Sequence, residues 1–383
     1  ELIDNYRSCE QIVGFANEFI RTVGNRMKHE DIVAVKKEQG GVMVICVASS
    51  LEMSMLNAWR SIYRQYEKDT VAVLTTTNDQ AYLVTELLNQ NGFRARLIQS
   101  NDGFSMMNLA EIRFFLEQVS KEGPVISEEA WEKAKEKLCK TFKRSNHLEA
   151  CINAFTQFSD TNEKMYITDL EAFLQEARFN DFCKCEHGEI CVSTIHKAKG
   201  REFDTVCMLV SGPKTLTAAQ QRSIYVGITR AKRALYIFHN TDYFERIQNS
   251  PQGRTVRWGR DTKTYDEPNE IVLPLSYKDV WLSFYKAKNN AALIEELQSG
   301  DVLQFREQKF GEKTKLVFWA DINGKTQRVA CSSDDYYERF CAQKRKGYSP
   351  VEARVQFVVS WWDQNTREEC YIVLPILRLR KKK

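Results

Sequence analysis

The sequence predicts an α/β protein built on a parallel sheet with helices on both faces, a helical insertion, and a small, mostly β C-terminal domain. Three observations lead to this prediction. Short apolar runs alternate with amphipathic stretches over residues 9–98, as in βαβ units. Only helical periodicity remains between about residues 104 and 180. After residue 300, short strand patterns follow one another around turn sequences.

The first third of the chain supplies strands and helices in turn. A helix is expected over residues 9–23, with Ser8 as its N-cap and Glu10 in its first turn. Further helices are expected over residues 52–66 and Asn78–Asn91. The apolar runs between and after them predict buried strands at Val42–Ala48, Thr70–Thr75 and Arg94–Ile98.

The sheet is expected to resume after the helical insertion. The strands predicted there are Ile190–Ile195, Thr205–Val210 and Ala234–His239, with a helix over residues 217–232 before the last of them. Residues 249–270 are polar and without pattern, which indicates a linker. A pair of helices is expected near residues 276–287 and 289–298.

The remainder of the chain reads as β structure. The expected strands are Asp301–Arg306, Lys315–Asp321, Lys325–Ser332, Glu352–Trp362 and Glu368–Arg378, with a hairpin turn at Asn323-Gly324. Some five strands in ~80 residues are typical of a small barrel or a curled sheet. We therefore expect a sheet domain over 1–103 and 181–248, a helical insertion over 104–180, a linker over 249–270, and a helical lead-in with a barrel-like module over 271–383.

Composition limits the class of protein. The net charge of +4 is small, no apolar run is long enough to span a bilayer, and no membrane partner is expected. Eleven scattered cysteines are typical of reduced thiols in a cytoplasmic protein. Cys183, Cys185, His187 and Cys191 could bind zinc, but their spacing is not that of a usual zinc site, and no metal site is predicted. Because the chain begins at Glu1 without a leader, we expect it to be part of a longer protein.

Two short segments carry the chemistry. Thr194–Asp204 and Tyr225–Lys232 each combine cations, a glycine and hydroxyl groups beside a strand, a combination suited to holding phosphates. A glycine-rich phosphate loop is missing from the sequence. Gly324-Lys325-Thr326 resembles the end of one, but Trp319 stands where that loop needs its first glycine. The sequence therefore predicts half of a nucleotide site.

Three ordered motifs resemble the C-terminal half of superfamily 1 DNA helicases, the family of UvrD, Rep and PcrA. Asn5–Ser8, followed by Ile12 and Ala16-Asn17, looks like motif IV of that family. Thr194–Glu202 is similar to motif V, and Tyr225–Ala231 with Arg222 upstream is similar to motif VI. The resemblance covers roughly residues 1–245, and three motifs in the right order are far more specific than any one.

The resemblance implies a RecA-like motor domain, called 2A, with a reduced version of the 2B insertion between motifs IV and V. It implies that Arg230 is an arginine finger that reaches the transferred phosphate, with Arg7 as a second catalytic cation. Lys199 would also bind the γ-phosphate, and Glu202 would accept a hydrogen bond from the ribose. Gly200 would permit a tight turn, and Tyr225 would support the nucleotide side of the site by packing.

The same resemblance implies contacts to DNA and further partners. Thr194 and His196 are the residues expected to contact the DNA backbone. ATP and Mg²⁺ would be held mainly by an N-terminal motor domain that carries the Walker A and B segments, so the chain by itself is expected to be inactive. The expected partners are that domain and single-stranded DNA or DNA junctions, in a helicase that hydrolyses ATP and acts in DNA repair.

Two alternatives remain open. The chain could be a degenerate or fused helicase half that only binds DNA or a partner protein. A nuclease activity is the other, although the terminal region has no paired-carboxylate and lysine signature. That region does contain Trp319, Trp361, Trp362 and Tyr371, which could stack on bases but are better explained as core. Adjacent Trp361 and Trp362 must point to opposite faces of a strand, so at most one of the two is expected to be exposed.

Overall fold

The computed structural model describes residues 4–23, 30–37, 40–98, 104–177, 179–182, 188–212, 216–250, 255–282, 297–322, 324–363 and 367–382. The chain forms two compact units, each discontinuous in sequence. Unit 1 comprises Glu1–Ile98 and Cys185–Asn269, and unit 2 comprises Gln99–Lys184 and Glu270–Lys383. None of the described helices has both the length and the apolar character needed to cross a membrane.

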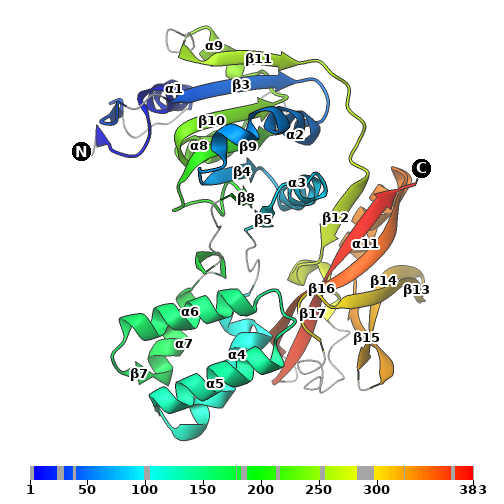
Figure 1. Cartoon of the computed structure of the whole chain (residues 1–383). Coiled ribbons are helices and arrows are strands. Elements are labelled where there is room, and N and C mark those ends of the chain that lie inside the picture. Colours follow the sequence, from blue (N-terminus) through cyan, green and yellow to red (C-terminus); the bar gives the residue numbers. More distant parts are fainter. Residues whose placement is uncertain are drawn as a thin grey trace. The chain divides into compact units, whose positions relative to one another are not determined.

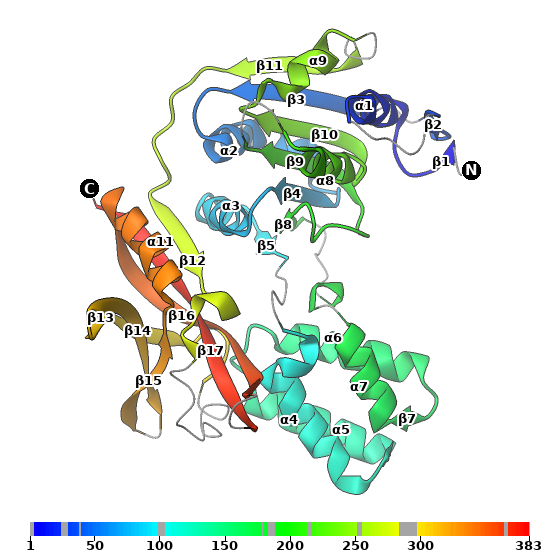
Figure 2. The same ribbon diagram turned by 180° about the vertical axis from the view of Figure 1, so that it is seen from behind.

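Unit 1 is built on a seven-stranded sheet whose paired strands are all parallel (Figures 1 and 2). The strand order is β11-β3-β10-β9-β4-β8-β5. In that order the strands are Arg257–Asp261, Gly41–Val47, Ala231–His239, Phe203–Val210, Val71–Thr75, Ile190–Thr194 and Ala95–Leu97. Central strands β4 and β8 are buried at every position, which explains why they read as continuous apolar runs.

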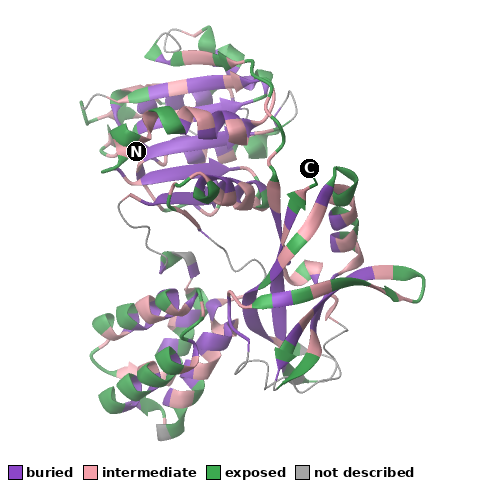
Figure 3. Ribbon diagram, turned by 45° about the vertical axis from the view of Figure 1, so that its right-hand side comes forward, coloured by how far each residue is buried: buried purple, intermediate pink, exposed green. Residues whose placement is uncertain are grey.

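Helices cover both faces of this sheet. Helices α1 (Glu10–Arg21) and α8 (Ala218–Ile228) contribute to one apolar core, together with α9 (Glu245–Gln248). Helices α2 (Leu51–Ile62) and α3 (Asn78–Gln90) contribute to the core on the other face. Figure 3 shows the strands between these layers as buried. The predicted parallel sheet with helices on both faces is therefore confirmed.

The predicted linker contains a strand, which corrects the sequence expectation. Strand β11 pairs in parallel with β3 from Arg257↔Met43 to Asp261↔Val47. Its sequence, Arg-Trp-Gly-Arg-Asp, is mostly exposed or half-buried. An edge strand gains its hydrogen bonds from a partner far away in sequence and needs no apolar run of its own. Its pattern is therefore weak in the sequence.

Unit 2 contains the helical insertion. Its helices are α4 (Ala110–Val119), α5 (Glu128–Thr141), α6 (Leu148–Thr161) and α7 (Ile167–Glu176), and strands β6 (Val125–Ile126) and β7 (Met165–Tyr166) form a short antiparallel pair. The core of these helices is aromatic: the Phe115 ring stacks on Phe155 and meets Trp131 edge-on at a centroid distance of 5.0 Å.

Unit 2 also contains a six-stranded sheet whose paired strands are all antiparallel, in the order β12-β17-β16-β13-β14-β15. In that order the strands are Glu270–Pro274, Glu368–Lys381, Tyr348–Asp363, Val302–Phe310, Lys313–Ile322 and Lys325–Cys331. The pairing leaves β12 and β15 as edges, so the described strands form an open sheet rather than the barrel that was one expectation. A pair of helices was predicted near residues 276–287 and 289–298. In the first of these ranges Tyr277–Asp279 form a single 3-10 turn. Residues 283–296, which make up most of the predicted pair, lie outside the described residues.

The helical insertion and the C-terminal sheet share one hydrophobic core, although the sequence suggested two separate modules. Phe357 of β16 stacks on the ring of His147 at 4.5 Å and meets Phe104 edge-on at 5.2 Å. Leu109 forms an isolated bridge to Val359. Three residues of the insertion thus pack on one strand located 200 or more positions later, a contact that no local pattern reveals.

His147 lies at the centre of this shared core and is 4% exposed. Its Nε2 lies 2.7 Å from the carbonyl oxygen of Gln356 and 3.0 Å from Oγ of Ser299. Burial lowers the pKa of His147 below its ordinary value, while the charge of Glu111 and the bond to Gln356 partly oppose that shift. The imidazole is therefore neutral in the folded protein.

This burial predicts a loss of stability in mild acid. Because the pKa of His147 is lower in the folded than in the unfolded chain, the unfolded chain binds the proton more readily below pH 6.5. Stability should be fully present above that pH and fall by up to about 1.4 kcal/mol per pH unit below it. Urea unfolding at several pH values between 7.5 and 5 measures this slope. A His147→Gln variant that keeps the whole slope would assign it to other groups.

Candidate nucleotide and DNA site

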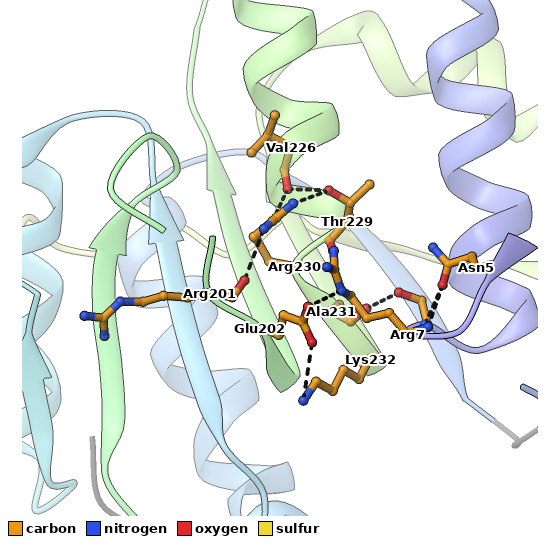
Figure 4. Close-up of polar contacts among 10 residues, drawn as sticks. Asn5, Arg7, Arg201, Glu202, Val226, Thr229, Arg230, Ala231 and Lys232 are labelled. Atoms are coloured by element: carbon orange, nitrogen blue, oxygen red, sulfur yellow. Dashed lines mark hydrogen bonds and ion pairs between the residues drawn. The ribbon is translucent and has the colours of Figure 1, made fainter. Parts of the chain in front are cut away.

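Three distant segments meet at the amino end of two central strands. Glu202 immediately precedes β9 and Arg230 immediately precedes β10. The register Ala231↔Phe203 places these two residues at the same level of the sheet. Arg7 comes from the loop between β1 (Asp4–Asn5) and α1. All three were predicted as site residues, and Figure 4 shows them together.

Glu202 lies between two cations. Nε of Arg7 is 2.5 Å from its Oε1 and Nζ of Lys232 is 3.7 Å from its Oε2. The Arg7 Nε–H makes no well-directed hydrogen bond, so this pair is held mainly by charge. Nη1 of Arg7 also donates a long hydrogen bond of 3.4 Å to the carbonyl oxygen of Thr229. The side chains of Arg7 and Glu202 remain 37% and 34% exposed, so both are accessible to a ligand.

The Arg230 guanidinium is folded back onto the end of α8. Nε donates to the carbonyl oxygen of Val226 at 3.0 Å, Nη1 to that of Arg201 at 3.2 Å, and Nη2 to Oγ1 of Thr229 at 3.1 Å. Burial lowers the pKa of Arg230 from its usual value, the nearby charge of Arg7 lowers it further, and Glu202 opposes both. Two guanidinium groups thus lie close to one carboxylate, an arrangement with surplus positive charge.

The loop that carries Arg7 is anchored directly on β10. Oγ of Ser8 donates to the carbonyl oxygen of Ala231 at 2.7 Å, and the backbone N–H of Cys9 donates to that of Lys232 at 2.9 Å. The sequence suggested Ser8 as the N-cap of α1, and this prediction is wrong. Cys9 occupies the N-cap position, and its side chain makes no capping hydrogen bond. A Cβ at Gly40 would lie 2.4 Å from the carbonyl oxygen of Arg233, so only glycine permits this close approach.

The segment from Thr194 to Glu202 runs from the carboxyl end of β8 to the amino end of β9. Thr194 ends β8 opposite Thr75, the last residue of β4. Val71, at the start of β4, pairs with Thr205, two residues after the start of β9. Glu202 lies three residues before Thr205. Four steps along β4 and three along β9, at about 3.3 Å each, therefore make ~23 Å along the strands between the two ends of the segment. The predicted DNA residues and the Arg7–Glu202–Arg230 cluster therefore lie at opposite ends of the strands.

The residues within this segment differ in exposure. Thr194 is buried, with 7% of its surface exposed, whereas His196 is exposed. Nζ of Lys197 donates to Oδ1 of Asn78 at 2.7 Å, which secures the start of the segment against α3. Gly200 has φ +91°, a conformation that L-residues with a Cβ rarely adopt.

Two predicted nucleotide residues are not part of the cluster. Lys199 is exposed, and no described contact joins it to Arg7 or Arg230. Tyr225 is partly buried and packs against the core beneath α8. Sequence reasoning missed Tyr6, whose 65% exposed side chain stands next to Arg7. The signal in the sequence was one large aromatic residue within the polar run of residues 4–8.

An open cavity of about 1060 Å³ lies at the amino ends of β3 and β10. Gln11, Gly14, Arg233 and Arg257 are among the residues that line it. Arg7, Glu202 and Arg230 are not among them. The cluster therefore lies outside this cavity.

The described residues suit a polyphosphate better than a metal ion. Arg7 and Arg230 present guanidinium groups, which match phosphate geometry. No group of three or more possible metal ligands occurs among the residues that the structure describes. Of the zinc candidates, Cys183, Cys185 and His187 lie outside those residues. Cys191 is buried in β8 and is disulfide-bonded, unlike the eight cysteines with free thiols, so the expectation of reduced thiols does not hold for Cys191.

The aromatic residues of the C-terminal sheet are either exposed or packed against the core, according to the face of the strand on which they lie. Trp362 is 58% exposed, while Trp361 and Tyr371 pack against the shared core. This confirms that at most one of the adjacent tryptophans is exposed. Trp319 is half-buried on β14 and lies between two arginines.

Comparison with known proteins supports the resemblance seen in the motifs. The UvrD-like helicase C-terminal domain matches residues 1–122 and 116–242. Over 169 residues the chain is 28% identical to the DNA helicase II of Rickettsia typhi and to a probable DNA helicase II homolog of Rickettsia conorii. Each match covers 39% of this chain and 23% of the relative, so the chain spans only about a quarter of the length of these relatives.

Among solved structures, the chain is similar to the C-terminal domain of a possible DNA helicase from Lactobacillus plantarum. The similarity has a TM-score of 0.33 at 13% identity and covers 67% of this chain and 99% of that one. At that TM-score it adds nothing to the sequence match.

Proposed function

Since this chain belongs to the UvrD-like helicase C-terminal domain family, we propose that it is the second motor domain of an ATP-dependent DNA helicase. In this proposal it supplies the cationic wall of a nucleotide site, whose phosphate loop and Mg²⁺ ligands lie on an N-terminal motor domain. Hydrolysis at that site drives movement along single-stranded DNA.

The cluster of Arg7, Glu202 and Arg230 is the observation that carries the proposal. It brings together two cations from segments more than 220 residues apart, at the amino ends of β9 and β10. Guanidinium groups placed at a transferred phosphate stabilise the charge that develops there. We assign Arg230 as the arginine finger and Arg7 as the second phosphate ligand.

The remaining predicted residues support this site in different ways. Lys199 and the turn at Gly200 lie on the exposed segment that leads to Glu202, from which Lys199 can reach a phosphate on a closing domain. Glu202 has both oxygens engaged by Arg7 and Lys232, so binding of a ribose hydroxyl would compete with an ion pair. The exposed ring of Tyr6 suits stacking on a nucleobase beside the phosphates.

We place the DNA contact at the carboxyl ends of the strands, opposite the cluster of Arg7, Glu202 and Arg230. His196 offers an exposed imidazole there, and buried Thr194 fixes the point where the segment leaves β8. Because one segment of nine residues, Thr194–Glu202, joins these strand ends to the phosphate cluster, a shift at the phosphates can move the DNA grip. Contacts of this kind bind the backbone without reading sequence.

A binding-only role is favoured by one observation. Nε, Nη1 and Nη2 of Arg230 each donate a hydrogen bond to a protein oxygen. An arginine with a purely structural role makes contacts of this kind. In that case the chain is a degenerate or fused helicase half that binds DNA or protein without assisting hydrolysis.

The isolated chain provides the first test. It should show no ATP hydrolysis above background, because the groups that bind Mg-ATP are expected on another domain. It should bind single-stranded DNA weakly, with an affinity that falls steeply as salt increases. Measured turnover that disappears in an Arg230→Ala variant would show a complete site in this chain and contradict the proposal.

A further inference from the structure

Trp319 lies between two arginines on the outer face of three C-terminal strands. The guanidinium carbon of Arg306 is 4.1 Å from the centre of the Trp319 ring, and that of Arg328 is 5.8 Å from it. Arg306 is on β13 and Arg328 is on β15, the two strands that flank β14. Each strand thus contributes one residue to a cationic and aromatic cluster.

Alternation along β14 shows that this cluster is on the face away from the core. Phe318 and Ala320 are buried in the shared core, so Trp319 between them points to the other face. Trp319 is directly opposite Gln304 on one side and Arg328 on the other. Nε1 of the indole is buried and makes no hydrogen bond, so the edge of the ring carries an unused donor.

Arg306 carries an uncompensated charge. It is exposed and makes no ion pair with any residue that the structure describes. The adjacent carboxylate of Glu307 points to the other face, where it contacts Lys344 and accepts a hydrogen bond from Tyr337 at 2.5 Å. Asp321 accepts a hydrogen bond from Thr326. The charge of Arg306 therefore remains available to an anion.

Other arginines on the same sheet lack this property. Arg354 is paired with Glu352 and Arg380 with Glu270, each at 2.5 Å. Cross-strand pairs of this kind stabilise a sheet and leave little charge for a ligand. The combination of an unpaired arginine, a second arginine and an aromatic ring is therefore specific to β13–β15 among these positions.

We propose that the outer face of β13–β15 binds single-stranded nucleic acid through Arg306, Arg328 and Trp319. The two guanidinium groups bind phosphates. The guanidinium of Arg306, whose carbon is 4.1 Å from the centre of the indole ring, also offers a plane on which a base can stack. Planar stacking surfaces favour nucleic acid over an acidic peptide, which has no bases to stack. The inference rests on the proposed DNA function and places a second contact in unit 2, outside the motor motifs.

The test measures binding of oligothymidylate to the full chain at several salt concentrations. The double variant Arg306→Gln/Arg328→Gln should lose about ten-fold or more in affinity, because a glutamine side chain cannot neutralise a phosphate. Its salt dependence should flatten by about 1.4 in slope, since each phosphate contact to a single strand contributes about 0.7. Arg354→Gln, which removes a paired arginine, is the matched control and should bind normally.

Two further variants separate the outcomes. Trp319→Phe should retain most of the affinity and Trp319→Leu should lose it, with unfolding curves to confirm that both fold. If only His196→Ala weakens binding, the proposed motor contact stands and this inference is wrong. If only the arginine pair matters, this inference stands and the motor contact does not.

Three results would overturn the inference. Wild-type affinity and salt slope in the double variant would show that the face does not bind DNA. An equal loss in Arg354→Gln would show that only net charge matters. Equal binding of polyglutamate, lost in the same double variant, would identify an acidic protein as the partner.

Discussion

Replacement of Arg230 by alanine, in a protein that carries both motor domains, is expected to slow ATP hydrolysis by about 10³- to 10⁵-fold. Nucleotide affinity should change far less, because the charge is needed mainly where negative charge develops in the transition state. The hydrogen bonds to Val226, Arg201 and Thr229 hold the guanidinium near the cluster in the open state. Closure of the second domain would then transfer it to the phosphate.

Single-turnover hydrolysis and equilibrium nucleotide binding measure the two effects separately. Arg230→Lys should recover little, because an ammonium group cannot reproduce the planar fork. Arg233→Ala is the matched control: Arg233 is a cation of the same strand, but it pairs with Asp69. Equal losses of affinity and rate in Arg230→Ala would contradict the finger role and favour the binding-only alternative.

Replacement of Phe357 by alanine is expected to destabilise the whole of unit 2 by about 3–5 kcal/mol. Phe357 is 4% exposed and contacts rings from the insertion, namely Phe104, His147 and Phe179. Its loss leaves a cavity where the insertion and the sheet meet. Hydrogen exchange should therefore quicken in both segments together.

Trp362→Ala, on the same strand, is the control for that experiment. Its side chain is 58% exposed, and its removal should cost less than about 1 kcal/mol. Two separate unfolding transitions in the Phe357→Ala protein, with the insertion unaffected, would show that the insertion and the sheet are independent, as the sequence alone suggested.

The sequence predicted the elements whose signals are local. Strands β4 and β8 read as apolar runs, and helices α2 and α3 begin at Ser50 and Thr77, which cap them. Helix α11 (Asp334–Arg345) was missed because only Tyr336 and Phe340 are buried in it. Its N-cap Ser333 and its acidic first turn and basic last turn were the signals that could have found it.

The candidate site was predictable only as a set of residues. Arg7, Glu202 and Arg230 followed from motifs, but the ion pair between Arg7 and Glu202 depends on how the loop before α1 docks on β10. That docking uses Ser8, Gly40 and backbone groups, none of which carries a local pattern. The shared core around Phe357 and the arginine–tryptophan cluster on β13–β15 likewise depend on strand register, which single-sequence patterns do not specify.

The most direct test of the account is a structure of a two-motor-domain protein containing this chain, with ADP and a γ-phosphate mimic bound. The account predicts that guanidinium nitrogens of both Arg230 and Arg7 lie within about 3.2 Å of the mimic, with Arg230 released from Val226 and Arg201. A bound mimic with both guanidinium groups still on their present partners would contradict the central claim that this cluster is one wall of the nucleotide site.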